Sequence, residues 1–406
     1  MRISLLTVGN EILSGDTVNT NVSWIGHELT QIGCSILTQI TVPDTSNSIH
    51  QALKTLLNQE PDSIIVTGGL GPTDDDITRQ SLFNFMGTDS EFDEEYWLSL
   101  GDRYKSFGGK ISEINKCQAL VPKNGDIIPN PNGSARGFIF EKNGSIIISL
   151  PGVPYEMKAM MLETIIPMYK ARNIKAKTII NMRTTGISES ALIELIEPII
   201  SKDHGCDIGY YPSILGVDIR ISHKEEAPVK TLVKHLNTIL DEAVYGTNKE
   251  SLEEVVVQLA RNKEKTIAIA ESCTGGLIGH RLTEVSGSSG IFLGGLVVYS
   301  NQAKKDLLNV SKNLLNDKGA VSYEVAEKMA LNTLKLFDVD YGLSVTGIAG
   351  PTGGTENKPV GLIYIGLADK DGTEVKKLNF NGNRENNKLR TSQVALNWLR
   401  LRLLHD

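Results

Sequence analysis

Paired cysteines are missing from this chain of 406 residues. Its four cysteines, Cys34, Cys117, Cys206 and Cys273, lie far apart, and no two of them form a C-x-x-C pair. Scattered thiols are typical of proteins in a reducing compartment, and they do not form a zinc-binding pattern. We therefore expect a cytoplasmic location and no structural zinc.

Long apolar runs and basic runs are missing as well. No stretch approaches the roughly 18 apolar residues of a membrane span, and the opening MRISLLTVGNEIL lacks the features of a signal peptide. The formal net charge is −7, whereas a protein that grips a phosphate backbone usually has a basic surplus. We expect neither a membrane nor a nucleic acid as partner. Small anionic ligands stay compatible with this charge, because backbone N–H groups bind phosphate.

The length and the residue pattern predict several domains. In residues 1–170, strand patterns alternate with helix patterns, and a hairpin is expected to turn at Asn143–Gly144. Residues 251–406 return to the same alternation, whereas residues 171–250 have a mixed pattern. The expected fold class is α/β, with two three-layer α/β domains (1–170 and 251–406) joined by a small α+β module (171–250). Ligand loops in such domains gather at the carboxyl ends of the strands.

Hydroxyl side chains stand at the ends of predicted strands in four segments of the last domain, three of which also contain glycines. These are ESCTGG (271–276), GSSG (287–290), YSNQAKK (299–305) and TGIAGPTGG (346–354). The first one stands where a strand passes into a helix, and the exposed N–H groups of a helix N-terminus can bind a nucleotide phosphate. A tight turn with a helix cap needs similar residues, so both interpretations stay open for ESCTGG.

A nucleophile for amide hydrolysis needs a base close to it. The last domain has only two histidines, His280 in the middle of a helix pattern and His405 near the end. A Ser-His-Asp triad is therefore disfavoured, and a serine with a lysine or tyrosine partner is the natural alternative. Cys273 is a competing nucleophile, although a lone buried cysteine more often serves packing.

These segments, together with GAVS-x-EVA and KPVG, resemble the C-terminal domain of the CinA family, the nicotinamide-nucleotide amidohydrolases. The resemblance implies hydrolysis of nicotinamide mononucleotide (NMN) to nicotinic acid mononucleotide and ammonia, without a cofactor. It also implies the choice of Ser289 over Ser288 as the nucleophile. Lys304 would be the base, and either Arg384 or Arg390 would reach the site. The remaining implied residues are Tyr299 and Thr346 in catalysis and Ser272, Thr274, Gly275, Gly276, Gly347 and Gly350 in substrate binding.

Three segments of the first domain have the residues of a phosphate site. They are GNEIL-x-G-x-x-x-NTN (9–21), TGGLGPTDDD-x-T (67–78) and LPGVPYEM (150–157). The glycine-rich loop suits a diphosphate, and the carboxylates after it exceed what helix capping needs, although capping is the alternative. With two glutamates they predict a site for Mg²⁺, Mn²⁺ or Co²⁺. The candidate metal ligands are Glu11, Asp74, Asp75, Asp76 and Glu156, and the candidate substrate-binding residues are Asn19, Asn21, Thr67, Gly68, Gly69 and Gly71.

The first domain resembles the MoaB/Mog-like molybdopterin-binding fold of CinA proteins, and the domain order resembles CinA over the whole chain, with a KH-type module in the middle. This resemblance implies a metal-dependent ADP-ribose pyrophosphatase and a homodimer. Alternatives are hydrolysis of another dinucleotide such as FAD, or binding of a pterin or nucleotide without turnover. RNA binding is disfavoured, because residues 171–250 have no GXXG motif.

Overall fold

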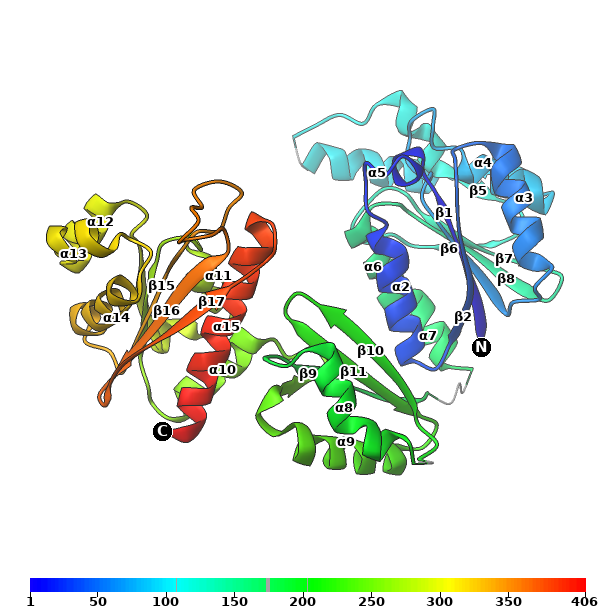
Figure 1. The fold of residues 1–406 in the computed structure, drawn as a ribbon. Coiled ribbons are helices and arrows are strands. Elements are labelled where there is room, and N and C mark those ends of the chain that lie inside the picture. The colour runs from blue at the N-terminus through cyan, green and yellow to red at the C-terminus, as the bar shows by residue number, and fades with distance from the viewer. Residues whose placement is uncertain (107, 173–175, 203) are drawn as a thin grey trace. The chain divides into compact units, whose positions relative to one another are not determined.

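The computed structural model describes residues 1–106, 108–172, 176–202 and 204–406. The chain divides into two compact units, Met1–Lys177 and Thr178–Asp406, and Figure 1 shows the ribbon of each. None of the described helices combines the length and the apolar character that a membrane crossing requires.

The first unit alternates strands and helices along most of its length. Its elements are β1 (Arg2–Val8), α1 (Asn10–Leu13), α2 (Thr20–Gln31), β2 (Ser35–Val42), α3 (Ser46–Leu57), β3 (Ser63–Thr67), α4 (Thr78–Met86), β4 (Ser90–Phe92), α5 (Glu94–Ser106), the 3₁₀ turns of Glu113–Ala119, β5 (Leu120–Pro122), β6 (Asp126–Ile128), β7 (Gly137–Lys142), β8 (Ser145–Leu150), α6 (Pro154–Met160), a π-helical turn (Met161–Ile165) and α7 (Ile166–Lys170).

Six of these strands form one sheet in the order β2-β1-β3-β8-β7-β6. The first four are parallel, and β7 and β6 are antiparallel additions. Alternate residues of the strands pack on opposite faces, Leu5 in one core with α2, α6 and α7 and Leu6 in a second core with α3 and α4. The result is a three-layer α/β domain.

The predicted hairpin forms between β7 and β8. Asn143 and Gly144 both have positive φ, 52° and 79°, which is the backbone of a type I′ turn. Asparagine and glycine tolerate this conformation better than other residues do, so the two-residue Asn-Gly sequence was sufficient to locate the turn.

The second unit begins with an α+β module. Its elements are β9 (Thr178–Thr184), α8 (Glu189–Ile200), β10 (Asp207–Ser213), β11 (Gly216–His223), α9 (Glu226–Leu240), a 3₁₀ turn (Asp241–Ala243) and β12 (Val244–Thr247). The strands form an antiparallel sheet in the order β10-β11-β9-β12. Leu192 of α8 and Leu236 of α9 pack with Ile219 of the sheet, which gives the module a core of its own.

The rest of the second unit is another α/β domain. Its elements are α10 (Leu252–Asn262), β13 (Ile267–Glu271), α11 (Leu277–Thr283), a 3₁₀ turn (Ser288–Gly290), β14 (Phe292–Val297), α12 (Asn301–Leu308), α13 (Lys312–Lys318), α14 (Tyr323–Phe337), β15 (Tyr341–Gly347), β16 (Leu362–Asp369), β17 (Gly372–Asn379) and α15 (Arg384–His405).

The sheet of this domain has the order β14-β13-β15-β16-β17. Its first three strands are parallel and the last two antiparallel. Helices α10, α11 and α15 cover one face, and α12, α13 and α14 cover the other. The predicted fold class, two three-layer α/β domains with a small α+β module between them, is therefore confirmed.

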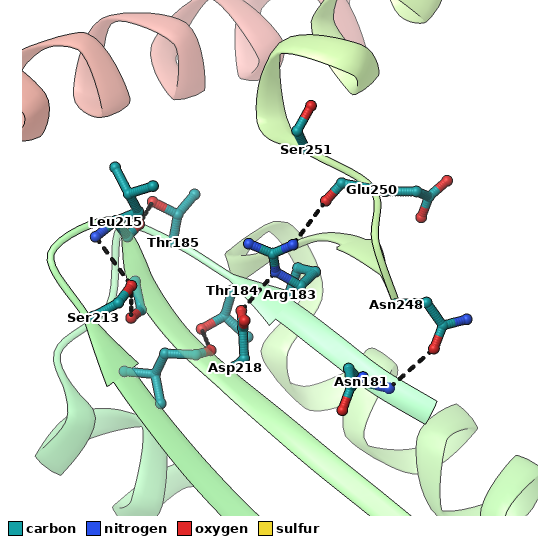
Figure 2. A network of polar contacts seen from close by, with 12 residues as sticks. Asn181, Arg183, Thr184, Thr185, Ser213, Leu215, Asp218, Asn248, Glu250 and Ser251 are labelled. Carbon is teal, nitrogen blue, oxygen red and sulfur yellow. Dashed lines mark hydrogen bonds and ion pairs between the residues drawn. The ribbon is translucent and has the colours of Figure 1, made fainter. Parts of the chain in front are cut away.

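Polar contacts of the module hold the segment that leads into the C-terminal domain, as Figure 2 shows. Arg183 of β9 donates to Asp218 Oδ1 at 2.8 Å and to the carbonyl oxygen of Glu250 at 3.2 Å, just before α10. Asn248 Oδ1 accepts from the backbone N–H of Asn181 at 3.2 Å. The side chain of Tyr245, from β12, is part of the apolar core of the C-terminal domain.

Candidate active site

The C-terminal domain collects polar side chains at the carboxyl ends of its parallel strands. Ser272 directly follows β13, and Tyr299 comes two residues after β14. Thr346 is the second-last residue of β15. Lys304 belongs to α12, which begins just after the Ser300 cap. This is the edge of the sheet where ligand loops of α/β domains gather.

Lys304 and Ser272 form the central contact of this site. The Nζ of Lys304 lies 2.9 Å from Ser272 Oγ, and it also donates to the carbonyl oxygens of Val298 at 2.7 Å and Tyr299 at 3.3 Å. The lysine side chain is 1% exposed. No carboxylate of the described residues forms an ion pair with it, and desolvation lowers the pKa of Lys304 to about 8. About a tenth of the Lys304 side chains are then neutral amines at pH 7, which is the form that acts as a base.

Cys273 is adjacent to Ser272 but has a different environment. Burial raises the pKa of its thiol to about 12. Because the thiolate is the nucleophilic form of cysteine, this environment disfavours Cys273 as a nucleophile.

Ser289 lies at the other edge of the sheet. It precedes β14, whereas Lys304 follows this strand, and β14 runs parallel to β13. The carbonyl oxygen of Ile291 accepts from the N–H of Ile267 at the start of β13, at 2.7 Å, which fixes this turn at the amino edge. At ~3.3 Å per residue, the strand separates the two side chains by roughly 20 Å. The expectation that Ser289 and Lys304 meet within one chain is therefore wrong, and Ser272 takes that place.

The late arginine that reaches the site is Arg384. Its guanidinium donates to Tyr299 Oη at 3.0 Å and to the carbonyl oxygen of Gly350 at 2.8 Å. Arg390 instead lines a separate cleft against the α+β module. The Thr346 hydroxyl is buried and donates to the carbonyl oxygen of Ala320 at 2.8 Å, so it can act toward a substrate only as an acceptor.

The ESCTGG loop is held by its own glutamate. The Glu271 carboxylate is 3% exposed and accepts from the N–H groups of Gly276 at 3.0 Å and Gly279 at 2.8 Å. The N–H of Gly276, which we expected to take part in substrate binding, is thus already bonded within the loop. The Thr274 hydroxyl is buried and has no hydrogen-bond partner within the described residues.

Two glycines at this edge of the sheet bear on substrate binding. Gly275 of this loop has a φ of +65°, and the Nζ of Lys388 lies 3.8 Å from where a β-carbon of Gly275 would be. Gly347, at the end of β15, is packed so closely that its β-carbon would lie 2.4 Å from a side-chain atom of Ile363. Lys388 thus lies beside the loop, and it comes four residues after Arg384 on the same face of α15.

The first unit has a pocket of about 500 Å³ at the carboxyl ends of β1 and β3. The glycine-rich loop forms one wall, and its conformation requires glycine. Gly68 has a φ of +105°, and a β-carbon there would lie 2.1 Å from the carbonyl oxygen of Val8. The predicted residues that line this pocket are Glu11, Asn19, Asn21, Thr67, Gly68, Gly69, Gly71, Asp75, Asp76 and Glu156.

Asn19 and Asn21 hold the walls of the pocket together. Asn19 caps α2 by accepting from the N–H of Val22, and it donates to the Thr7 hydroxyl at 2.9 Å. Asn21 donates to the carbonyl oxygen of Gly152 at 2.8 Å, while its Oδ1 is buried without a partner among the described residues. The Thr67 hydroxyl donates to the carbonyl oxygen of Pro151 at 2.9 Å. These side chains connect the pocket loops, and the free Asn21 oxygen is an acceptor left for a ligand.

The five candidate metal ligands are only partly brought together. Asp74 is absent from the pocket lining, and no three His, Cys, Asp or Glu side chains of the described residues are close enough to hold a metal ion. Asp76 accepts from the Thr73 N–H at 3.0 Å, and Glu156 accepts from Asn130 Nδ2 at 2.6 Å. The expectation of one five-carboxylate cluster is therefore wrong. Asp75, Asp76 and Glu11 nevertheless line the same pocket.

Three residues with a place in these sites were missed from the sequence. Glu271 lies inside a motif that we noted only for its hydroxyls, and Lys388 could have been found from its spacing of four residues to Arg384. Asp44 lines the first pocket and accepts from the N–H of Asn10 at 2.8 Å, and nothing near it in the sequence marked it.

Three family models match consecutive parts of the chain. They are the probable molybdopterin binding domain over residues 4–171, the damage-inducible protein CinA KH domain over residues 181–246 and the CinA C-terminal domain over residues 249–403. The predicted KH-type module and MoaB/Mog-like domain are thereby confirmed.

Two relatives match over nearly the whole length. A CinA-like protein of Geotalea uraniireducens is 40% identical over 100% of this chain and 98% of its own, and a putative competence-damage inducible protein of Clostridium botulinum is 40% identical over 99% and 100%. Among solved structures, competence/damage inducible protein CihA from Agrobacterium tumefaciens is 36% identical over 38% of this chain and 93% of its own, with a TM-score of 0.37. With two relatives at this identity over nearly the whole length, and with a CinA KH domain followed by a CinA C-terminal domain, the chain belongs to the CinA family.

Proposed function

We propose that the C-terminal domain hydrolyses the carboxamide of NMN, which releases ammonia and leaves nicotinic acid mononucleotide. The observation that supports this proposal most directly is the buried contact of 2.9 Å between Lys304 Nζ and Ser272 Oγ. A serine activated by a neutral lysine is an established arrangement for amide hydrolysis. We assign Ser272 as the nucleophile and Lys304 as the base.

The contacts of Lys304 orient its lone pair. In the neutral amine, the two N–H groups are directed at the carbonyl oxygens of Val298 and Tyr299, which leaves the lone pair for the Ser272 hydroxyl. As Ser272 Oγ attacks the carboxamide carbon, its proton passes to Lys304 Nζ. The C–N bond then breaks, and ammonia leaves with this proton. Water attacks the resulting ester, with the same amine as base, and restores the free serine.

The negative charge of the tetrahedral intermediate needs donors near the nucleophile. The backbone N–H groups of Cys273 and Thr274 directly follow Ser272, and neither donates to an oxygen within the described part of the chain. The N–H of Ser272 itself is already bonded to the carbonyl oxygen of Val345 at 2.9 Å. We therefore assign the amides of residues 273 and 274 as the oxyanion donors.

The substrate phosphate needs donors at this edge of the sheet, and the N–H groups of Gly276 and Gly279 are already bonded to Glu271. Lys388 lies beside Gly275, and the buried Thr274 hydroxyl lacks a partner among the described residues. We assign these two side chains to the phosphate. Arg384, which holds Tyr299 and the carbonyl oxygen of Gly350, positions the loops on either side of the substrate.

Ammonia release from NMN tests this proposal in the intact protein. We expect turnover in the presence of EDTA, since the assigned groups all belong to the chain. Ser272→Ala should abolish it, with an unchanged thermal unfolding midpoint. Turnover by this variant at the wild-type rate would overturn the assignment of the nucleophile.

We further propose that the first domain hydrolyses the diphosphate of ADP-ribose. The supporting observation is the 500 Å³ pocket, which joins a glycine-rich loop to several carboxylates. A loop of this kind offers backbone N–H groups to a diphosphate. Asn21 Oδ1, buried without a partner in the described structure, is an acceptor for a ribose hydroxyl.

The donor chemistry of this pocket fits a divalent cation that also binds the substrate. Mg²⁺ is typically held by one or two carboxylates, with substrate phosphate oxygens and water as further ligands. Asp75 and Asp76 are the residues that would hold it, from the loop that lies against the diphosphate. When bound, the cation would neutralise charge on the phosphate oxygens. Glu11 and Glu156 line the same pocket and can orient the ion's water ligands.

AMP release from ADP-ribose, measured with Mg²⁺, Mn²⁺ or Co²⁺ and again with EDTA, tests the second activity. Release that depends on the cation supports it. Binding without turnover would favour a pterin or nucleotide sensor, and faster release from FAD would identify a different dinucleotide. We expect the protein to act as a cytoplasmic homodimer, which sedimentation velocity checks.

A further inference from the structure

A second cleft lies within the Thr178–Asp406 unit, away from Ser272 and Lys304. Its volume is about 360 Å³, which is within the range of small-molecule sites, ~300–1,000 Å³. The loop after β9 and the turn between β10 and β11 form one side, and α15 and the residue that follows β17 form the other. The cleft thus lies where the KH-type module meets the C-terminal domain.

The walls of this cleft are fixed by hydrogen bonds. The Thr185 hydroxyl donates to the carbonyl oxygen of Leu215 at 2.9 Å, and both residues are visible in Figure 2. Gln393 of α15, 3% exposed, donates to the Thr185 hydroxyl at 3.1 Å and accepts from Arg281 at 2.9 Å. The shape of the cleft is therefore set by contacts that span the module, α15 and α11.

Arg390 is the cation of this cleft. It is half-buried, and it forms no hydrogen bond or ion pair with any part of the chain that the structure describes. The other arginines of α15 all have partners: Arg384 holds Gly350 and Tyr299, Arg400 donates to the carbonyl oxygen of Val244, and Arg402 pairs with Asp369. A guanidinium without a partner in a cleft is suited to a phosphate, which it can bind through two parallel hydrogen bonds.

The other lining residues indicate what the phosphate is attached to. Phe380 and Val394, which are partly buried against the apolar core of the C-terminal domain, line the cleft together with Arg390, and Glu189 lines it as well. An aromatic ring provides a stacking surface for a base, and a carboxylate accepts from sugar hydroxyls. We propose that this cleft binds a nucleoside monophosphate, with Arg390 on the phosphate, Glu189 on the ribose and Phe380 against the base.

This site is distinct from the proposed amidase site, although both use α15. Arg390 comes six residues after Arg384, which turns it by about 600°, or ~120° short of two full turns, to another face of the helix. Nucleotide in the cleft would therefore contact the same helix as the amidase substrate without entering that site.

Hydrogen exchange of the full-length protein with and without AMP tests the proposal, because it locates bound ligand even when other sites bind AMP too. We expect AMP to slow exchange in peptides that cover residues 185–190 and 213–217. In Arg390→Ala, the AMP concentration for half of this effect should rise by about tenfold or more, the loss of one charged contact. Arg390→Lys, which keeps the charge without the bidentate geometry, should lie between the two.

Arg220→Ala is the matched control, since Arg220 is also half-buried but belongs to the module and is absent from the cleft lining. It should retain the wild-type response, and the unfolding midpoints of all variants show whether they are folded. No slowed exchange at these peptides with millimolar AMP, or equal slowing in Arg390→Ala, would overturn the proposal. If adenosine slowed exchange as much as AMP does, the proposed role of the phosphate in binding would be wrong. If inorganic phosphate slowed it as much, the proposed role of the nucleoside would be wrong.

Discussion

The two candidate sites of this chain occupy the same place in two similar sheets, yet they are built differently. In the C-terminal domain the reactive pair is buried, and Lys304 is fixed by three contacts to Ser272, Val298 and Tyr299. In the first domain the carboxylates stand around an open pocket, and Asp75 is exposed. In the C-terminal site the polar side chains contact one another directly, whereas in the first domain they are spread out around a cavity.

This difference follows from the chemistry that we propose for each site. A serine nucleophile needs a base of shifted pKa, and burial without a counter-charge is what lowers the pKa of a lysine. Burial also fixes the geometry. Diphosphate hydrolysis instead needs charge neutralisation, which a cation and the substrate's own oxygens supply together. Carboxylates that are too far apart to bind a metal by themselves are compatible with such a shared site.

The largest effect should come from removing the C-terminal nucleophile. Ser272→Ala takes away the atom that attacks the carboxamide, so the kcat for ammonia release should fall by at least about 10³-fold. AMP release from ADP-ribose should be unchanged, because it belongs to the other unit. Both rates are measured on the same preparation.

Ser289→Ala is the matched control for this prediction. The side chain is exposed and lies at the amino edge of the sheet, so ammonia release should stay within about twofold, as for a surface substitution. A loss in Ser289→Ala as large as that in Ser272→Ala would mean that a second copy of the chain contributes this serine to the site.

The pH dependence should be the next largest effect, and it should separate the two activities. The base must be neutral, and the pKa of Lys304 is lowered to about 8. The kcat of the amidase should therefore rise about tenfold for each pH unit below 8 and level off above it. The rates should be measured at saturating NMN, because protonation of the substrate phosphate mainly changes binding and then has little effect on the rate. A flat profile between pH 6 and pH 8 would contradict Lys304 as the base.

Much of this fold was predictable because its signals are local. The Asn143–Gly144 turn, the Ser251 capping box of α10 and the alternating strand and helix patterns each depend on residues that are close in sequence. The site was harder, because a motif shows which residues are near one another in the chain but not which edge of the sheet they reach. Ser289 and Ser272 both stand in glycine-rich turns, and only the direction of β14 relative to β13 separates them. The shifted pKa of Lys304 likewise depends on burial, which no spacing rule reports.

A smaller effect is expected in the first domain. Asp76→Asn removes the charge of one of the carboxylates that would hold a cation, so AMP release at low Mg²⁺ should fall by about 10- to 100-fold. Raising the Mg²⁺ concentration should restore part of the rate, and ammonia release should not change. Asp74→Asn is the control, because Asp74 does not line the pocket. Equal losses in both variants would indicate a general effect of the acidic loop rather than a ligand role.

The smallest effect concerns the phosphate end of the amidase substrate. Lys388 lies beside Gly275 and is assigned to binding, not to the chemical step. Lys388→Ala should therefore raise the KM for NMN by about tenfold, the loss of one charge-assisted contact, with kcat nearly unchanged. Nicotinamide riboside, which has no phosphate, gives a sharper comparison: its slower hydrolysis should be the same in the variant and the wild type. If the variant lost activity equally on both substrates, Lys388 would be supporting the loop that carries Ser272. The amidase site would then resemble the first pocket, because backbone N–H groups, and not a lysine side chain, would bind the substrate phosphate.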